Sequence, residues 1–338
     1  MNHAQNTSIT PATAGNGTLS VVVPTHNEQD VIAAFHSRLV AVLDNLELEV
    51  EIIYVDDGSS DATARIITEL RATDERVALL ALSRQFGKEA ALSAGLDHSC
   101  GEAVVVIDAD LQDPPELIPA LIAQWQAGYD VVYAQRSRRE QETWLRRASA
   151  HTYYRLLSRL SPVPIPRDTG DFRLMSARAV VALRTLREQH RYMKGLFAWV
   201  GFRQIAVHYV RHGRHAGHSQ WNWLKLFGFA IDGITSFSIA PLRIATYLGL
   251  MASTTAFAYG LYIIYKTVAF GEPVRGFPTL MVAILFLGGM QLLCLGIIGE
   301  YVGRTYGESK RRPLYFIARS LTSRLAARRP SCAVDDPA

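Results

Sequence analysis

Short apolar runs alternate with longer amphipathic segments over the first 134 residues of the chain. The runs are rich in Val, Ile and Leu and have the length of buried strands, whereas the segments between them repeat apolar residues with the period of a helix. The predicted strands are 19–23, 49–55, 77–82, 103–107 and 130–134, and the predicted helices are 28–46, 61–71, 88–99 and 116–127. This alternation predicts an α/β fold with a mainly parallel, doubly wound, Rossmann-like sheet.

Polar residues directly follow the first three predicted strands. They read PTHNE at 24–28, DDGSSD at 56–61 and SRQFGK at 83–88. Since ligands of open α/β sheets bind beyond the carboxyl ends of the strands, we expect these loops to form one site. Neither GxGxxG nor GxxxxGK[ST] follows a strand, which argues against dinucleotide-binding and P-loop sites. As an alternative, Ser60 or Asp61 caps the next helix.

Carboxylates end the fourth predicted strand, in the sequence AVVVIDADLQDPPE at 103–116. Asp108 and Asp110 lie two residues apart, so in an extended segment both project to one side, and Gln112 continues this spacing. Hard oxygen ligands with open coordination positions suit Mg²⁺ or Mn²⁺ bound to a nucleotide diphosphate. The alternative is a turn and a helix start.

The end of the same stretch is interpreted as a helix start. Asp113 suits an N-cap, Pro114 the first helical position and Glu116 the capping-box position, so Asp113 and Glu116 are interpreted as structural. A bare DxD motif is weak, but one that closes a β-branched run and precedes a helix favours a metal site over a simple turn.

Two later segments, 244–265 and 276–299, contain no Asp, Glu, Lys or Arg. Each is long enough to cross the hydrocarbon core of a bilayer, so we expect two transmembrane helices; the alternative is a pair of buried helices in a large soluble domain. Before them, residues 221–243 place apolar residues at helical spacing opposite polar ones. This pattern predicts an amphipathic helix at the membrane interface.

Composition and charge agree with a membrane location. Of the 338 residues 49% are hydrophobic, and the net charge is +4, with eight Lys or Arg and one Glu at 303–330. The positive-inside rule places the N-terminal domain and this basic tail together in the cytoplasm, and no nucleic-acid partner is needed to explain the charge. Cys100, Cys294 and Cys332 have neither disulfide nor zinc spacing. Residues 1–17 have no signal-peptide pattern and are expected to be a flexible leader.

Seven segments carry a family resemblance. They are VVVPTHNE, VDDGSSDAT, FGKEAALSAGL, DADLQDPPE, GDFRLM, HRYMKGLFAWVGF and GIIGEYVGR. In this order they resemble the family 2 inverting glycosyltransferases of the GT-A fold, in the polyprenyl-phosphate branch that includes dolichol-phosphate mannose synthase and bactoprenol glucosyltransferase. The resemblance covers about residues 19–316. His26 stands where the family usually has Tyr, and Gln85 where Asn is common.

The resemblance implies a role for several residues. The nucleotide-binding residues are expected to be Pro24, Thr25, Glu28, Asp56, Lys88 and Asp108. Asp108, Asp110 and Gln112 are expected to hold the metal, Mg²⁺ or Mn²⁺. Asp110 and Asp171 are the expected catalytic residues, with Asp171 facing the acceptor. Because a polyprenyl phosphate is already largely deprotonated, Asp171 is either a base or an orienting residue, and the alternative is a turn residue.

Basic residues are candidates for binding the phosphates of the donor and the acceptor, because guanidinium and ammonium groups bind phosphate oxygens. The candidates are Arg136, Arg138, Arg191, Lys194 and Arg214. The alternative for such a run of charges is a solvated surface.

The sequence therefore predicts an inner-membrane enzyme that transfers a hexose, with UDP-glucose as the expected donor, to undecaprenyl or another polyprenyl phosphate. The rivals are transfer of mannose, a modified pentose or an N-acetylhexosamine by the same scaffold, and a silent membrane scaffold; a homo-oligomer is left open. The expected organisation is a leader at 1–17, a catalytic domain at 18–220, the interfacial region at 221–243, two transmembrane helices at 244–302 and a basic cytoplasmic tail at 303–338.

Overall fold

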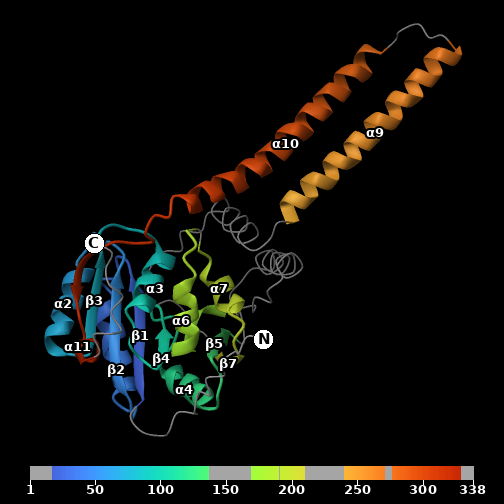
Figure 1. Cartoon of the computed structure of the whole chain (residues 1–338). Coiled ribbons are helices and arrows are strands. Elements are labelled where there is room, and N and C mark those ends of the chain that lie inside the picture. The colour runs from blue at the N-terminus through green and yellow to red at the C-terminus, as the bar shows by residue number, and fades with distance from the viewer. Residues whose placement is uncertain (1–16, 137–168, 190, 210–239, 271–275, 329–338) are drawn as a thin grey trace, which may run out of the picture.

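The computed structural model describes residues 17–136, 169–189, 191–209, 240–270 and 276–328. Within them the strands form an eight-stranded sheet in the order β7-β5-β6-β4-β1-β2-β3-β8 (Figure 1). The strands are β1 Thr18–Thr25, β2 Glu49–Asp56, β3 Val77–Leu82, β4 Ala103–Val106, β5 Val131–Arg136, β6 Thr169–Ser176, β7 Gln204–Tyr209 and β8 Ile317–Leu321.

Four of the seven strand pairs are parallel, which confirms the mainly parallel sheet. The sheet is nevertheless mixed. β6 lies between β4 and β5 and is antiparallel to both, and β8 is antiparallel to β3 at the edge. The four adjacent strands β4, β1, β2 and β3 all point the same way, so the loops that follow them share one edge of the sheet.

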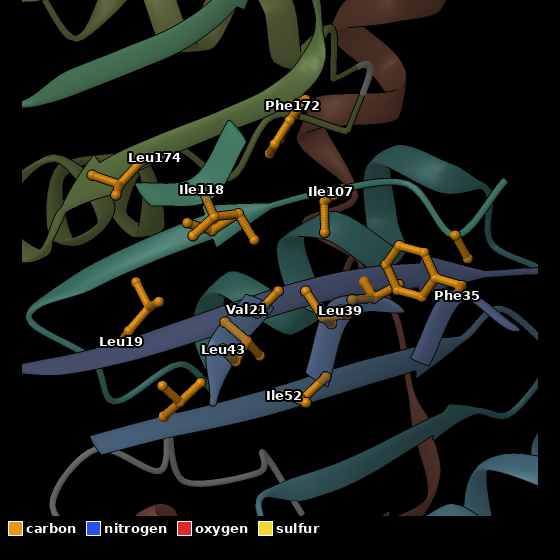
Figure 2. Close-up of a cluster of buried hydrophobic side chains, with 14 of the residues drawn as sticks. Leu19, Val21, Phe35, Leu39, Leu43, Ile52, Ile107, Ile118, Phe172 and Leu174 are labelled. Carbon is orange, nitrogen blue, oxygen red and sulfur yellow. The ribbon is translucent and has the colours of Figure 1, made fainter. Parts of the chain in front are cut away.

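Helices cover both faces of the sheet, as a doubly wound fold requires. They are α1 Ile32–Leu43, α2 Thr63–Thr73, α3 Lys88–Asp97, η1 Pro115–Leu117, α4 Ile118–Gln126, α6 Ala177–Thr185 and α7 Met193–Trp199. Side chains of β1 alternate between the faces: Val21 packs with α1 and α4 in the cluster of Figure 2, whereas Val22 packs with α3, α6 and α7. In Figure 2, Phe35 and Leu39 of α1 lie over the sheet. Each such buried side chain contributes about 1.5–3 kcal/mol, so the strand ends are firmly held.

Two glycines allow close approaches near the strand ends. A Cβ atom on Gly95 of α3 would lie 2.2 Å from Cγ1 of Val22. Gly58 has a φ of +63°, and a Cβ atom there would lie 2.5 Å from the carbonyl carbon of Arg84, so the loops after β2 and β3 touch. Larger side chains would push away α3 and the loop before it.

The start of the fourth predicted helix differs from the sequence prediction. The chain enters it through η1, with Pro114 extended and no side-chain cap. Asp113 instead accepts a hydrogen bond from the hydroxyl of Tyr209, and Glu116 pairs with Arg38 at 2.6 Å. The capping-box interpretation is therefore wrong, because both carboxylates bind side chains of other elements.

The two apolar segments form long helices that extend away from the sheet side by side (Figure 1). α9 covers Ala240–Phe270 and α10 covers Phe277–Ser309. Within them, Leu242–Phe270 and Val282–Ser309 are long and apolar enough to cross a membrane, and neither is buried inside the protein. They are candidate membrane spans, because their exposed apolar surface is what lipid would cover.

The chain returns to the sheet after α10. β8 pairs with β3, and α11, Arg324–Arg328, follows. Ser323 between them is fully buried and donates to the carboxylate of Glu51 in β2 at 2.7 Å. The predicted tail at 303–338 is therefore not separate from the fold as far as Arg328. Its residues 317–321 form β8, which covers the otherwise exposed edge of β3. The leader up to residue 16, the amphipathic helix up to residue 239, Arg138 and Arg214 lie outside the described residues.

Candidate active site

The loops after β1 and β2 are bound to each other at one edge of the sheet. Asp57 donates its backbone N–H to the carbonyl of Thr25 at 2.9 Å, and the Thr25 hydroxyl donates to the carbonyl of Val55 at 3.2 Å. The backbone N–H of Glu28 donates to the Thr63 hydroxyl at 2.9 Å. The structure therefore brings together four of the residues predicted to bind the nucleotide, Pro24, Thr25, Glu28 and Asp56.

Asp56 is the last residue of β2 and is 4% exposed. Its Oδ2 accepts the backbone N–H of Ser59 at 3.3 Å, while Oδ1 is buried and has no donor in the part of the chain that the structure describes. Burial raises the pKa of this carboxyl. A buried acceptor without a donor suits an N–H group of a ligand. Asp61, in contrast, accepts the backbone N–H of Thr63 at 3.0 Å, but the N-cap residue of α2 is Ala62 and α2 has no side-chain cap, so capping by Ser60 or Asp61 is not confirmed.

Asp57 fixes the loop after β3. Its two carboxylate oxygens accept the backbone N–H groups of Phe86 and Gly87 at 2.7 and 2.9 Å. Hydrogen bonds to a carboxylate are among the stronger ones in proteins. They set the position of Lys88, which follows Gly87 and begins α3.

The ammonium of Lys88 joins two carboxylates from different strands. It lies 2.7 Å from an oxygen of Asp108, just after β4, and 2.6 Å from an oxygen of Asp171 in β6. The Lys88 side chain is 45% exposed, whereas that of Asp171 is only 14% exposed. Because β4 and β6 are neighbours, the residue predicted for the donor and the residue predicted for the acceptor meet at one cation.

The charges of this group shift three pKa values. Partial burial lowers the pKa of Lys88, but the carboxylates of Asp108 and Asp171 outweigh it, and the net shift is upward. Burial would raise the pKa of Asp171, but Lys88 and Lys194 reverse the shift, and the pKa is lowered. At Asp108 the effect of burial exceeds the opposing effect of the Lys88 charge, so the pKa of Asp108 is raised. Lys88 is therefore a cation and Asp171 an anion at neutral pH.

Two further cations lie near Asp171. The Arg173 guanidinium is buried, donates to the Gly170 carbonyl at 2.9 Å and lies over the ring of Phe197; burial lowers its pKa to about 10. Lys194 lies in the first turn of α7, and burial lowers its pKa. Its ammonium has no hydrogen bond or ion pair with any described residue. Lys194 is therefore available to bind an anion.

Arg136 and Arg191 differ in their surroundings. Nε of Arg136 donates to the hydroxyl of Tyr209 at 3.4 Å, and this hydroxyl donates in turn to Asp113. Arg136 is thus linked through Tyr209 to Asp113, which lies between β4 and η1. Arg191 donates to the carbonyl of Leu186 at 2.5 Å, and burial lowers its pKa. Its described hydrogen bond supports the segment before α7.

Asp110 and Gln112 lie in the turn after β4. The backbone N–H of Gln112 donates to Oδ1 of Asp110 at 3.1 Å, and Leu111 between them has a φ of +58°. Among the described residues no group of three or more His, Cys, Asp or Glu side chains gathers around a metal position. The amide nitrogen of Gln112 is buried without an acceptor there. Two carboxylates and an amide nonetheless offer hard oxygens with coordination positions left open, so Asp108, Asp110 and Gln112 fit Mg²⁺ or Mn²⁺.

The sequence pattern did not point to Glu89 or Arg173. Glu89 accepts the backbone N–H of Met193, while its Oε2 is buried without a donor among the described residues. Burial, followed by the charge of Asp171, raises its pKa to about 7. Both residues lie in segments that carry the family resemblance. Glu89 stands beside Lys88 in FGKEAALSAGL, and Arg173 is the basic residue among the apolar residues of GDFRLM.

Comparisons with known proteins match both parts of the chain. The family model "Glycosyl transferase family 2" matches residues 20–183, and "GtrB C-terminal hairpin" matches residues 240–305. The uncharacterized glycosyltransferase sll0501 of Synechocystis sp. is 49% identical over 300 residues, which cover 89% of this chain and 94% of that protein. The bactoprenol glucosyl transferase of Shigella phage SfV is 48% identical over 299 residues, which cover 88% of this chain and 97% of that protein.

Solved structures also overlap with the chain. Mannosyl-3-phosphoglycerate synthase from Rubrobacter xylanophilus superimposes with a TM-score of 0.47 at 18% identity, over 65% of this chain and 72% of that one.

Proposed function

The chain belongs to glycosyl transferase family 2 and is a glycosyltransferase, and from this premise we propose that it transfers glucose from UDP-glucose to a polyprenyl phosphate such as undecaprenyl phosphate, with inversion. Its similarity to proteins named bactoprenol glucosyl transferase over nearly their whole length supports this choice of sugar and acceptor. The observation that carries the proposal is the contact of Lys88 with both Asp108 and Asp171, because it joins a donor-side and an acceptor-side carboxylate.

On the donor side, we assign the uracil to the loops after β1 and β2. The buried Oδ1 of Asp56 would accept a uracil N–H, and Pro24, Thr25 and Glu28 would line the same position. Asp108, Asp110 and Gln112 would hold Mg²⁺ or Mn²⁺, which when bound offsets the charge of the diphosphate leaving group.

On the acceptor side, a phosphate oxygen of the lipid forms a bond to the anomeric carbon. The bond from that carbon to the UDP oxygen breaks, and its electron pair leaves with UDP. A phosphate monoester has a second pKa of about 6, so the acceptor needs no base at neutral pH. We therefore assign Asp171 to orienting the acceptor, and Lys194 and Arg136 to its phosphate oxygens, with Arg138, Arg191 and Arg214 as further candidates.

The position in the membrane is part of the proposal. α9 and α10 would form a membrane hairpin, which keeps the catalytic domain beside a lipid acceptor. Because β8 follows the second span and pairs with β3, the two flanks of the hairpin lie on one side of the membrane. The basic residues at 303–330 favour the cytoplasmic side of the inner membrane.

A panel of labelled UDP- and GDP-sugars, each incubated with the full-length protein, undecaprenyl phosphate and Mg²⁺ or Mn²⁺, tests the proposal after lipid extraction. Label from UDP-glucose should appear in the lipid fraction. Label from mannose, a pentose or an N-acetylhexosamine alone would reassign the donor, and a lipid fraction unlabelled by every donor would contradict the function.

A further inference from the structure

We propose that residues 308–316, from the last two residues of α10 to the residue before β8, are a positioning element that fixes the two cations Lys88 and Lys194. We call these residues the post-membrane segment. The inference rests on the proposed function and adds a role for a part of the chain that carries none of the residues assigned to either substrate. It follows from contacts with two separate loops of the site.

The post-membrane segment holds the loop that leads to Lys88. The backbone N–H of Ser83 donates to the carbonyl of Phe316 at 2.9 Å, and the rings of Phe86 and Phe316 lie 6.3 Å apart, tilted by 53°. The carboxylate of Asp57 binds the same loop at Phe86. The loop is therefore fixed both by the sheet edge and by the chain that leaves the membrane.

The same segment holds the chain before α7. The Glu308 carboxylate accepts the backbone N–H of Gln189 at 2.7 Å, and the side-chain amide of Gln189 donates to the carbonyl of Arg312 at 2.5 Å. α7 begins at Met193, and Lys194 lies in its first turn. Gln189 therefore links the chain that precedes Lys194 to two residues of the post-membrane segment, Glu308 and Arg312.

Tyr315 connects these two regions. Its hydroxyl donates to the carboxylate of Asp97 at 2.8 Å, and Asp97 pairs with Arg187 at 2.6 Å. Asp97 is 2% exposed and is the last residue of α3, the helix that Lys88 begins. One buried carboxylate therefore joins α3, the segment before α7 and the post-membrane segment, and such shared networks resist displacement as a unit.

This arrangement matters because the two cations come from different elements. Lys88 contacts Asp171 directly and the charge of Lys194 also acts on Asp171, so both cations set the charge and the position of the carboxylate that we assign to the acceptor. A displacement of about 1 Å in a reacting geometry can lower the rate by roughly 10²-fold. Loss of the contacts of the post-membrane segment should therefore weaken use of the lipid acceptor, although no substrate-binding group is removed.

The test compares two double variants of the full-length protein in lipid nanodiscs. Glu308→Gln with Tyr315→Phe removes a charge and a hydroxyl from the post-membrane contacts. Glu300→Gln with Tyr306→Phe makes the same chemical changes on α10, where Glu300 pairs with Arg304 and Tyr306 is 62% exposed. We expect the first variant to raise the KM for undecaprenyl phosphate at least about fivefold, with the Kd for UDP within about twofold, and the second to change neither.

A wild-type acceptor KM in the folded first variant would overturn the inference. If that variant does not fold, Phe316→Leu and Phe316→Ala provide the second test. Phe316→Leu should keep the wild-type KM for the acceptor, and Phe316→Ala should raise this KM. A wild-type acceptor KM in both variants would also overturn the inference. Failure of the wild-type protein itself to transfer sugar would instead overturn the proposed function, and this inference with it.

Discussion

The ammonium of Lys88 and the carboxylate of Asp171 lie 2.6 Å apart, although one begins α3 and the other lies in β6. The pair forms because Asp57 fixes the loop before Lys88 and because β6 inserts beside β4. Asp108 contacts the same ammonium at 2.7 Å. Both sides of the proposed reaction therefore depend on one cation.

Lys88→Gln should lower kcat/KM for transfer at least about 10²-fold, because Asp108 and Asp171 would face each other without their common cation. Arg65→Gln is the control, since Arg65 pairs with Glu69 on the exposed side of α2. Steady-state transfer assays on both variants measure the difference. A kcat/KM of Lys88→Gln within about threefold of the wild-type value would show that Lys88 does not act in the site.

Asp110→Asn removes a carboxylate charge with almost no change in volume, so it tests the metal assignment. Activity should fall at least about 10²-fold at every Mg²⁺ and Mn²⁺ concentration, while the fold survives. Asp44→Asn, which affects only an exposed ion pair with Arg76, should retain activity. Near wild-type turnover of Asp110→Asn across the metal titration would contradict the assignment.

Glu89 gives the folded protein a pH dependence. Burial and the charge of Asp171 raise its pKa from 4.5 to about 7. Between these values the unfolded chain loses the proton first, so the contribution of Glu89 to the free energy of unfolding is highest below 4.5 and falls as the pH rises to about 7. Glu89→Gln removes this titration.

The free energy of unfolding of Glu89→Gln, relative to the wild type, should therefore rise by about 1–3 kcal/mol between about pH 5 and pH 8. Chemical denaturation in detergent measures it. Glu47→Gln, at an exposed position, is the control and should show no such change. A difference between Glu89→Gln and wild type that is the same at both pH values would show that Glu89 does not titrate in this range.

The pairing of β8 with β3 predicts that a reporter at the C-terminus and one at the N-terminus lie on the same side of the membrane. The basic residues at 303–330 predict that this side is the cytoplasm. Fusions to a phosphatase active only in the periplasm and to a fluorescent protein measure this. Phosphatase activity at the C-terminus would contradict the topology.

The strand and helix order up to β5 could be predicted because it depends on local patterns. Val104–Ile107 is β-branched and followed by carboxylates, and the geometry of parallel sheets then requires Asp108 to lie at the site edge. The pairing of Asp108 with Lys88 was not predictable in the same way. It depends on the close approach of two loops at Gly58 and on the carboxylate of Asp57.

Other features depend on partners that are distant in the sequence. Asp113 has the local signature of a helix cap, but Tyr209 of β7 provides a buried donor, and this tertiary hydrogen bond replaces the cap. β8 reads IARSL, with only a weak apolar alternation, and forms because β3 offers an unpaired edge. The unusual environment of Glu89 likewise arises only when α3 and α7 come together.

The central claim is that the site at Lys88, Asp108 and Asp171 transfers glucose from UDP-glucose to a lipid phosphate. The most direct measurement is transfer of labelled glucose into undecaprenyl phosphate by the wild type and by Asp171→Asn, with calorimetric titration of UDP on both proteins. The account predicts labelled lipid for the wild type, at least about a 10²-fold loss for Asp171→Asn, and a Kd for UDP within about threefold. Undiminished transfer by Asp171→Asn, or no labelled lipid from the wild type, would contradict it.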